Sequence, residues 1–201
     1  MTKKKRLMFI SALTVLVIAL FLSVFFLNFH ISESETTSRL KASAYSSMDA
    51  EFSLSGKTYF YSEGGEEIGD IFDSNFVQRL DENSPEVLRF ANLKDKYNGT
   101  LLAVSFIKEK VNYNPFFPSS EIDVMVYYSL TGNSSYFDGF RQSYLGGNDP
   151  AVFFKTTQGP RLIKQGLFTY RDRTRGFVSL PAYKKKLGEE LAQGIYQKIM
   201  S

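Results

Sequence analysis

Three arginines alternate with other residues in the stretch TYRDRTRG, at positions Arg171, Arg173 and Arg175. Successive side chains of an extended strand point to opposite faces, so the three guanidinium groups are predicted to project from one side. A guanidinium group binds carboxylate or phosphate in two-pronged fashion. The spacing therefore predicts a face that meets an anion, which is supplied either by the protein itself or by a partner.

A second basic cluster precedes the C-terminus, in the stretch PAYKKKLGEEL. Cations near the start of a helix oppose the helix macrodipole, so we expect these lysines to serve solubility or a partner rather than helix stability. The candidate anion-binding or partner-binding residues are Arg171, Arg173, Arg175, Lys184, Lys185 and Lys186.

Residues for catalysis are scarce, because the chain has no cysteine and a single histidine, His30. Carboxylates do cluster around glycines in EGGEEIGD (63–70), but their spacing does not match a calcium-binding loop. A solvated turn is the expected reading, with a weak cation site or catalytic carboxylates as alternatives. No catalytic residue, metal ligand or cofactor is predicted, and the protein is expected not to be an enzyme. A carboxylate-dependent hydrolase of wall material is the enzymatic alternative.

The charge is unevenly distributed along the chain. Residues 31–100 hold 7 basic and 13 acidic side chains, whereas residues 101–201 hold 13 basic and 8 acidic ones. Either the acidic first half folds against the basic second half, or the basic end faces an external anion such as lipid headgroups, a wall polymer or an acidic protein. A solvated strand face is the third possibility.

The N-terminal residues indicate a membrane protein. Leu7 to Leu27 is an uncharged apolar run that follows Lys3, Lys4, Lys5 and Arg6. A helix of this length matches a hydrocarbon core of about 30 Å, and the positive-inside rule predicts a cytoplasmic N-terminus. The run is too long for a cleaved signal peptide, and the bulky residues after it do not suit a cleavage site. We expect an uncleaved signal-anchor.

Hydrophobic periodicity and turn residues predict the remaining elements. Leu40, Ala44, Met48 and Phe52 recur every four residues and predict a helix over 38–52. The loop NPFFPSS (114–120) carries two prolines. Helices are predicted at 73–80, 83–99 and 180–201. Strands are predicted at 57–62, 101–107, 121–130, 151–157, 161–175 and 176–180, of which the strand at 161–175 is long or broken.

This order predicts an α+β fold in which a single N-terminal transmembrane helix precedes one extracytoplasmic domain. The domain is expected to pack a mainly antiparallel sheet on helices and to end in a C-terminal amphipathic helix. The predicted segments are a cytoplasmic tip (1–6), the transmembrane helix (7–29), a membrane-proximal stalk or helix (30–56) and the domain itself (57–201).

These observations favour a non-enzymatic, single-pass (bitopic) protein of the cell membrane with its C-terminal domain outside. The domain is expected to be a binding or scaffold module, an accessory subunit of a cell-envelope, secretion or conjugation assembly. Its partners would be other envelope proteins or anionic polymers and headgroups, with no nucleic acid. The alternative is a pilin-like or pseudopilin-like subunit, an architecture that is similar in having an apolar helix continued by an amphipathic one and a β-rich head. The processing site and the early glutamate typical of that class are not found in Leu7–Leu27.

Overall fold

The computed structural model describes residues 3–46, 54, 56–94, 96–146 and 162–200. Within these residues the chain is α+β, with four helices and one sheet of six strands. The elements in chain order are α1 (Lys3–Phe26), β1 (His30–Ser46), β2 (Lys57–Glu63), α2 (Gly69–Asp81), β3 (Glu86–Phe90), β4 (Thr100–Asn112), β5 (Ser119–Ser129), α3 (Ser135–Leu145), β6 (Leu162–Val178) and α4 (Leu180–Met200).

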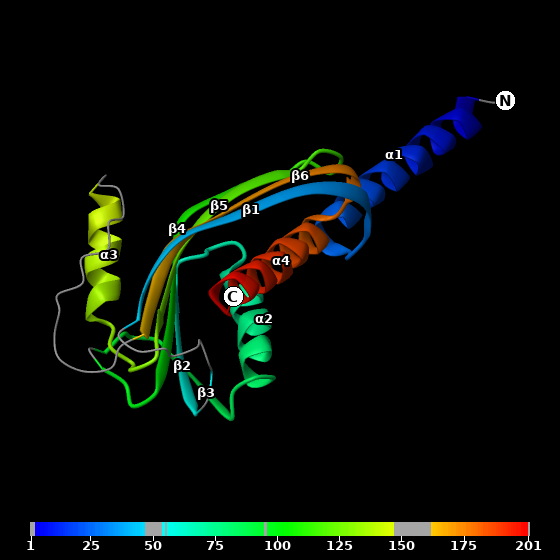
Figure 1. Ribbon diagram of the computed structural model, residues 1–201. Coiled ribbons are helices and arrows are strands. Elements are labelled where there is room, and N and C mark those ends of the chain that lie inside the picture. The colour runs from blue at the N-terminus through cyan, green and yellow to red at the C-terminus, as the bar shows by residue number, and fades with distance from the viewer. Residues whose placement is uncertain (1–2, 47–53, 55, 95, 147–161, 201) are drawn as a thin grey trace.

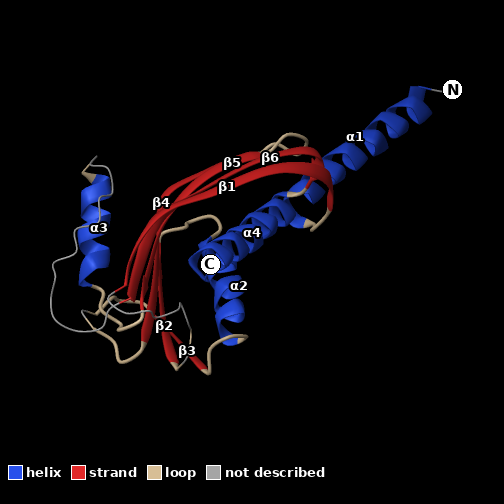
Figure 2. Cartoon of the chain, in the orientation of Figure 1, coloured by secondary structure: helices blue, strands red, loops and turns tan. Residues whose placement is uncertain are grey.

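The sheet is strongly curved, and helices lie on both of its faces (Figure 1). Helices α2 and α4 lie in the concave side, α3 lies on the convex side, and α1 extends away from the folded head. Figure 2 shows the same arrangement, with the long strands arching over α4. We call the side covered by α2 and α4 the inner face of the sheet and the opposite side the outer face.

The strand order is β1-β6-β5-β4-β2-β3. The first three neighbouring pairs are antiparallel, whereas β4–β2 and β2–β3 are parallel. The sheet is therefore mixed: the predicted antiparallel pairing holds for three of its five strand pairs, and the two pairs that involve β2 are parallel. Both parallel pairings involve β2, which is followed by the helix α2 that crosses the inner face before β3.

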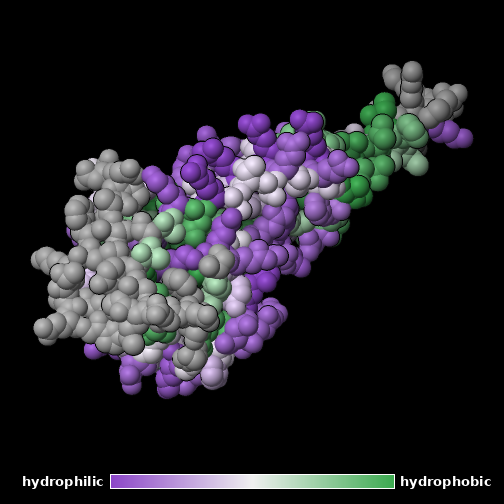
Figure 3. Space-filling view, in the orientation of Figure 1, coloured by the Kyte–Doolittle hydropathy of each residue, from purple (hydrophilic) through white to green (hydrophobic). Residues whose placement is uncertain are grey.

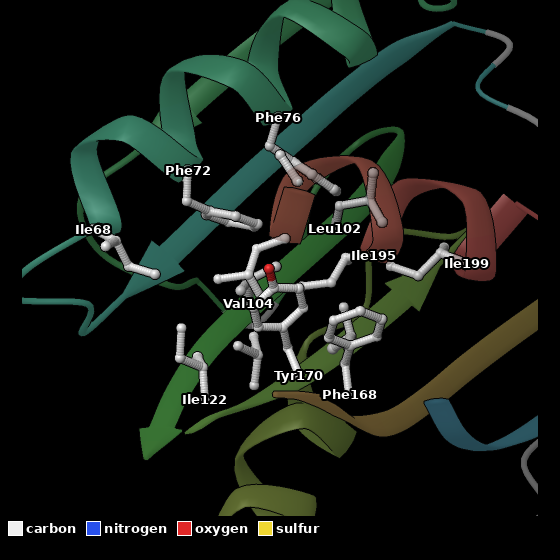
Figure 4. Close-up of a cluster of buried hydrophobic side chains, with 14 of the residues drawn as sticks. Ile68, Phe72, Phe76, Leu102, Val104, Ile122, Phe168, Tyr170, Ile195 and Ile199 are labelled. Carbon is white, nitrogen blue, oxygen red and sulfur yellow. The ribbon is translucent and has the colours of Figure 1, made fainter. Parts of the chain in front are cut away.

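The main core fills the space between the inner face and the two helices that cover it. Figure 4 shows Phe72 and Phe76 of α2 meeting Leu102 of β4, and Ile195 of α4 close to Phe168 of β6. The predicted apolar row of the C-terminal helix is confirmed, because all five members are buried: Tyr183, Leu187, Leu191, Ile195 and Ile199. A smaller cluster around Tyr127 and Phe137 lies under α3 on the outer face.

The helix predicted over 38–52 is wrong in its described part, since residues 30–46 form the edge strand β1. A spacing of four is also a multiple of the two-residue period of a strand, so Leu40 and Ala44 share a strand face as well. The many Ser and Thr residues of this segment lower helix propensity and suit a strand. Residues 30–46 are part of the sheet rather than of a stalk. The amphipathic helix that motivated the pilin-like alternative is not formed there.

The helix predicted over 83–99 is also wrong, because this segment contains the short edge strand β3. The expected helix cap does not form. The Ser84 hydroxyl lies 2.8 Å from the Thr58 hydroxyl and donates to the Gly56 carbonyl oxygen at 3.1 Å. Ser84 is thereby tied to β2, and Pro85 precedes an edge strand, where a missing backbone donor is tolerated.

Several other predictions are confirmed. The strands predicted at 57–62, 101–107 and 121–130 correspond to β2, β4 and β5, and the helix predicted at 73–80 corresponds to the second half of α2. The strands predicted at 161–175 and 176–180 are present but not separate, because they form the one continuous strand β6, in which Gly176 adopts φ 118°. The strand predicted at 151–157 lies outside the described residues.

Candidate functional site

Strand β6 presents two chemically different faces. Arg171, Arg173 and Arg175 are exposed, whereas Asp172 and Thr174, which alternate with them, are 1 and 2% exposed. The predicted alternation is therefore confirmed. We call the exposed side of these three residues the arginine face, and it belongs to the outer face of the sheet.

Arg171 is paired within the protein. Its Nη2 donates to Glu121 Oε1 of β5 at 2.9 Å, and Lys108 Nζ of β4 lies 2.6 Å from the other oxygen of the same carboxylate. The hydrogen bonds from Lys108 and Arg171 hold the pKa of Glu121 below its usual range. One carboxylate, that of Glu121, thus serves two cations.

Arg173 and Arg175 lie directly across from Glu35 and Glu33 of β1 in the strand register. No carboxylate lies within 4.0 Å of either guanidinium group in the part of the chain that the structure describes. Residues directly opposite across an antiparallel pair are close enough for long side chains to attract. The two glutamates reduce the positive potential of the face, but the guanidinium donors are still open to solvent.

On the inner face, Asp172 is the centre of a buried polar network. Its Oδ2 accepts hydrogen bonds from Tyr183 Oη at 2.8 Å and from Thr174 Oγ1 at 2.9 Å, and its Oδ1 lies 2.6 Å from Lys186 Nζ. The Thr174 hydroxyl also lies 2.8 Å from the Ser34 hydroxyl of β1. The network joins α4, β6 and β1, and the three donors satisfy the buried charge.

The tyrosines around this network are held in their neutral form. Burial, followed by the charge of Asp172 and the hydrogen bond to it, raises the pKa of Tyr183 far above its usual value. Burial and the 2.6 Å hydrogen bond from its hydroxyl to Glu190 Oε2 raise the pKa of Tyr170 in the same way. Both phenols therefore serve as hydrogen-bond donors in a structural role.

The structure does not bring the three lysines of α4 together with the arginines. Lys186 is turned into the protein toward Asp172, on the inner face of β6. Lys184 pairs with Glu67 at 3.0 Å, and Lys185 lies 3.8 Å from Glu189 one turn along the helix. The candidate set therefore divides into an exposed arginine face and a lysine run whose members contact four different carboxylates, those of Glu67, Asp172, Glu189 and Glu190.

The carboxylates of the acidic glycine-rich segment before α2 (63–70) do not converge on one site, because they contact different parts of the protein. Glu63 pairs with Arg141 of α3 and accepts hydrogen bonds from Tyr61 at 2.6 Å and Ser105 at 2.7 Å. The N–H of Ile68, at the start of α2, donates to Glu109 Oε1 at 3.1 Å. Within the described ranges, no group of three or more His, Cys, Asp or Glu side chains is placed to hold a metal ion.

The comparisons with known proteins identify no family. A scan against models of protein families finds no match, and a search of curated proteins finds none either. Among solved structures, the chain is similar to the PelC dodecamer from Paraburkholderia phytofirmans, with 10% identity, a TM-score of 0.36, and coverage of 80% of this chain and 97% of that one. A point variant of the same dodecamer matches with 10% identity, a TM-score of 0.32, and coverage of 77% and 96%. Similarity this weak carries no argument about function.

Sequence reasoning did not anticipate the inward roles of Asp172 and Lys186. The sequence does contain a signal for the role of Asp172. This residue continues the alternating row of Phe168 and Tyr170, whose apolar side chains face the core. A charged residue at a position whose neighbours are apolar requires an internal partner. Lys186 lies three residues after Tyr183, so the two side chains share one side of α4 and both reach Asp172.

Proposed function

We propose that the protein is a non-enzymatic, single-pass membrane protein whose folded head acts as a binding or scaffold module outside the membrane. Residues Met8–Phe26 form one N-terminal helix long and apolar enough to span a bilayer. This helix supports the proposal most strongly, because its apolar side chains are exposed and it projects from a largely hydrophilic head (Figure 3). A helix that buried its apolar surface against its own domain would not need a bilayer.

The proposed orientation places the N-terminus in the cytoplasm. Lys3, Lys4, Lys5 and Arg6 precede the apolar segment, and Glu33 and Glu35 follow it in β1. Positive residues are retained on the cytoplasmic side of a spanning helix. The head would then lie outside, attached through a link of only three residues between α1 and β1.

The arginine face is the proposed partner-binding surface. Two of its guanidinium groups have solvent-facing donors, and the third shares Glu121 with Lys108. This arrangement suits carboxylate or phosphate groups, as an acidic envelope protein or an anionic surface polymer would supply. Lys184 and Lys186 do not belong to this surface, because each makes an ion pair within the head. As an accessory subunit of an envelope, secretion or conjugation assembly, the protein would hold a partner close to the membrane.

Topology and association test this proposal together. A reporter fused after Ser201 that is active only outside the cytoplasm should be active, and protease added to intact protoplasts should remove the head. Other envelope proteins should be recovered with the protein from detergent-solubilised membranes in amounts that fall as salt rises. A cytoplasmic C-terminus contradicts the proposed orientation, and recovery of the protein alone contradicts the scaffold role.

A further inference from the structure

The loop between β4 and β5 exposes two large aromatic side chains. Phe116 is 54% exposed and Phe117 is 68% exposed. Outside α1 and the adjoining Leu27, the other large apolar residues that are exposed among the described residues are Ile31, at 76%, and Leu145, at 66%. Ile31 is the second residue of β1, close to the end of α1. The exposed apolar side chains of the head are therefore concentrated near the base of the membrane helix.

The exposure of the loop is fixed by hydrogen bonds. Asn114 Oδ1 accepts from the N–H groups of Phe116 at 2.9 Å and Phe117 at 3.3 Å. The carbonyl oxygen of Phe116 accepts from the Gly176 N–H at 3.0 Å, and that of Pro115 accepts from the Val178 N–H at 2.9 Å. The loop thus continues the sheet alongside β6, and these hydrogen bonds hold its backbone in the conformation in which both rings are exposed.

Aromatic contacts connect the loop to the end of α1. Phe25 meets Tyr113 edge-on, with ring centroids 6.1 Å apart. Phe29, which follows α1, stacks on Phe177 at 4.7 Å, and Phe177 contacts Phe116 at 5.2 Å. The position of the loop relative to α1 is therefore set by direct packing, and the exposed Phe117 directly follows Phe116 in this loop.

We propose that the β4–β5 loop inserts into the bilayer interface beside α1, as a second contact between the head and lipid. The inference rests on the proposed function, because it requires α1 to span the membrane. Aromatic residues are favoured at the boundary between headgroups and acyl chains, and burying the two rings there removes their contact with water. Arg175 precedes Gly176, which bonds to the loop, so its exposed guanidinium group is placed to reach lipid phosphate.

The packing of Phe25 on Tyr113 and of Phe29 on Phe177 holds the head against the end of α1. The loop would add a contact with lipid from another part of the sheet, so the head would meet the membrane at two places. The arginine face would then be held at a constant angle to the membrane plane. The proposed lipid contact thus determines which partners the head can reach.

The natural absence of tryptophan makes the contact directly measurable. Single-tryptophan variants of the full-length protein would be made at three exposed sites, namely Phe117→Trp in the loop, Phe9→Trp in α1 and Leu145→Trp at the end of α3. Each would be reconstituted in phosphatidylcholine vesicles with and without brominated acyl chains, which quench tryptophan on contact. Figure 1 shows α3 at the end of the head far from α1, so Leu145→Trp is the solvent control.

Quenching of Phe9→Trp and Phe117→Trp, with none for Leu145→Trp, is the expected result. The fluorescence of the Phe117→Trp variant should be quenched more strongly by bromines near the headgroups than by bromines deep in the acyl chains. Its emission maximum should lie at a shorter wavelength than that of the solvent-exposed Leu145→Trp control. An Ile31→Trp variant should also be quenched. Quenching of Phe9→Trp alone overturns the loop contact and leaves the membrane anchor intact. No quenching of Phe9→Trp overturns the anchor and the loop contact together.

Discussion

Lys186 of α4 holds its ammonium group 2.6 Å from the carboxylate of Asp172, in the middle of the long strand β6. The side chains are 11 and 0% exposed, so both charges have been largely removed from water. This pair connects the helix that closes the core to the strand that carries the arginine face on its other side. Such a pair is costly to break, because the remaining charge is left buried without a counterion.

Replacing Lys186 by Met should destabilise the head strongly. The change leaves the Asp172 carboxylate buried without its cation, which costs about 3–5 kcal/mol. Lys185→Met is the matched control, because its ion pair with Glu189 is exposed and contributes about 0–0.5 kcal/mol. Denaturant unfolding of the detergent-solubilised protein, followed by circular dichroism, measures both. Equal losses of stability in the two variants would contradict the structural role of the buried pair.

Removing the charge of the arginine face should affect binding more than stability. Replacing Arg171, Arg173 and Arg175 by Gln breaks one exposed ion pair, so the expected loss of stability is under about 2 kcal/mol. Recovery of associated envelope proteins should fall and lose most of its dependence on salt. Lys57→Gln is the control, since it removes an exposed cation paired with Glu86 at the other end of the sheet. Marked unfolding of the triple variant with recovery unchanged would mean that the arginines stabilise the sheet and do not bind a partner.

A methyl group at Gly188 should disturb the packing of α4 against α2. A Cβ atom there would lie 2.7 Å from Ile71 Cγ2 and 3.0 Å from the backbone nitrogen of Phe72. Gly188→Ala is therefore expected to cost about 1–3 kcal/mol through overpacking. Gly139→Ala in α3 meets nothing within 4 Å and should instead stabilise the protein by about 0.5–1 kcal/mol. The melting temperatures of the two variants distinguish steric crowding from helix propensity. If both substitutions raised the melting temperature, the close approach of Gly188 to α2 would be contradicted.

Glu63 should make a pH-dependent contribution to stability. Burial acts to raise the pKa of Glu63, but hydrogen bonds from Arg141, Tyr61 and Ser105 outweigh it and lower the pKa from its usual value of 4.5. The ionised side chain therefore stabilises the fold above its unfolded-state pKa, and this contribution is lost as the pH falls through the folded-state pKa. Glu63→Gln should cost about 1 kcal/mol near neutral pH, reduced by partial exposure to solvent. Chemical unfolding of both proteins at neutral and acid pH should show the difference shrinking with acid, and a constant difference would count against this assignment.

The sequence predicted best those elements whose pattern has one interpretation. An uncharged apolar run as long as that within α1 has few alternatives, and the apolar row of α4 has five members spaced four residues apart. Periodicity failed where it was ambiguous or short. The spacing of Leu40 and Ala44 fits a strand as well as a helix, and pairing with β6 decides in favour of the strand. Such pairing joins residues far apart in the sequence, so no local window contains it.

The candidate site was predictable on the strand and not on the helix. Alternation placed Arg171, Arg173 and Arg175 on one face correctly, because a strand has a period of two. Three consecutive lysines on a helix point in three directions, since neighbouring residues do not share a face. Lys186 consequently faces the core while Lys185 faces solvent. The three lysines are adjacent in the sequence, but they do not form one surface in the structure.

The place of β6 in the sheet has a consequence for how the chain is made. Among the strands that the structure describes, the first, β1, pairs with β6 alone, and β6 lies between β1 and β5 and begins at Leu162. Until those late residues have been synthesised, β1 cannot join the sheet, whereas β2, β3, β4 and β5 can already pair with one another. The most non-local contacts, such as that of His30 with Val178, form last and make the fold one of high contact order. Completion of the head therefore waits for the synthesis of β6, and a nascent chain stalled before β6 would present β1 as an open edge to chaperones and proteases.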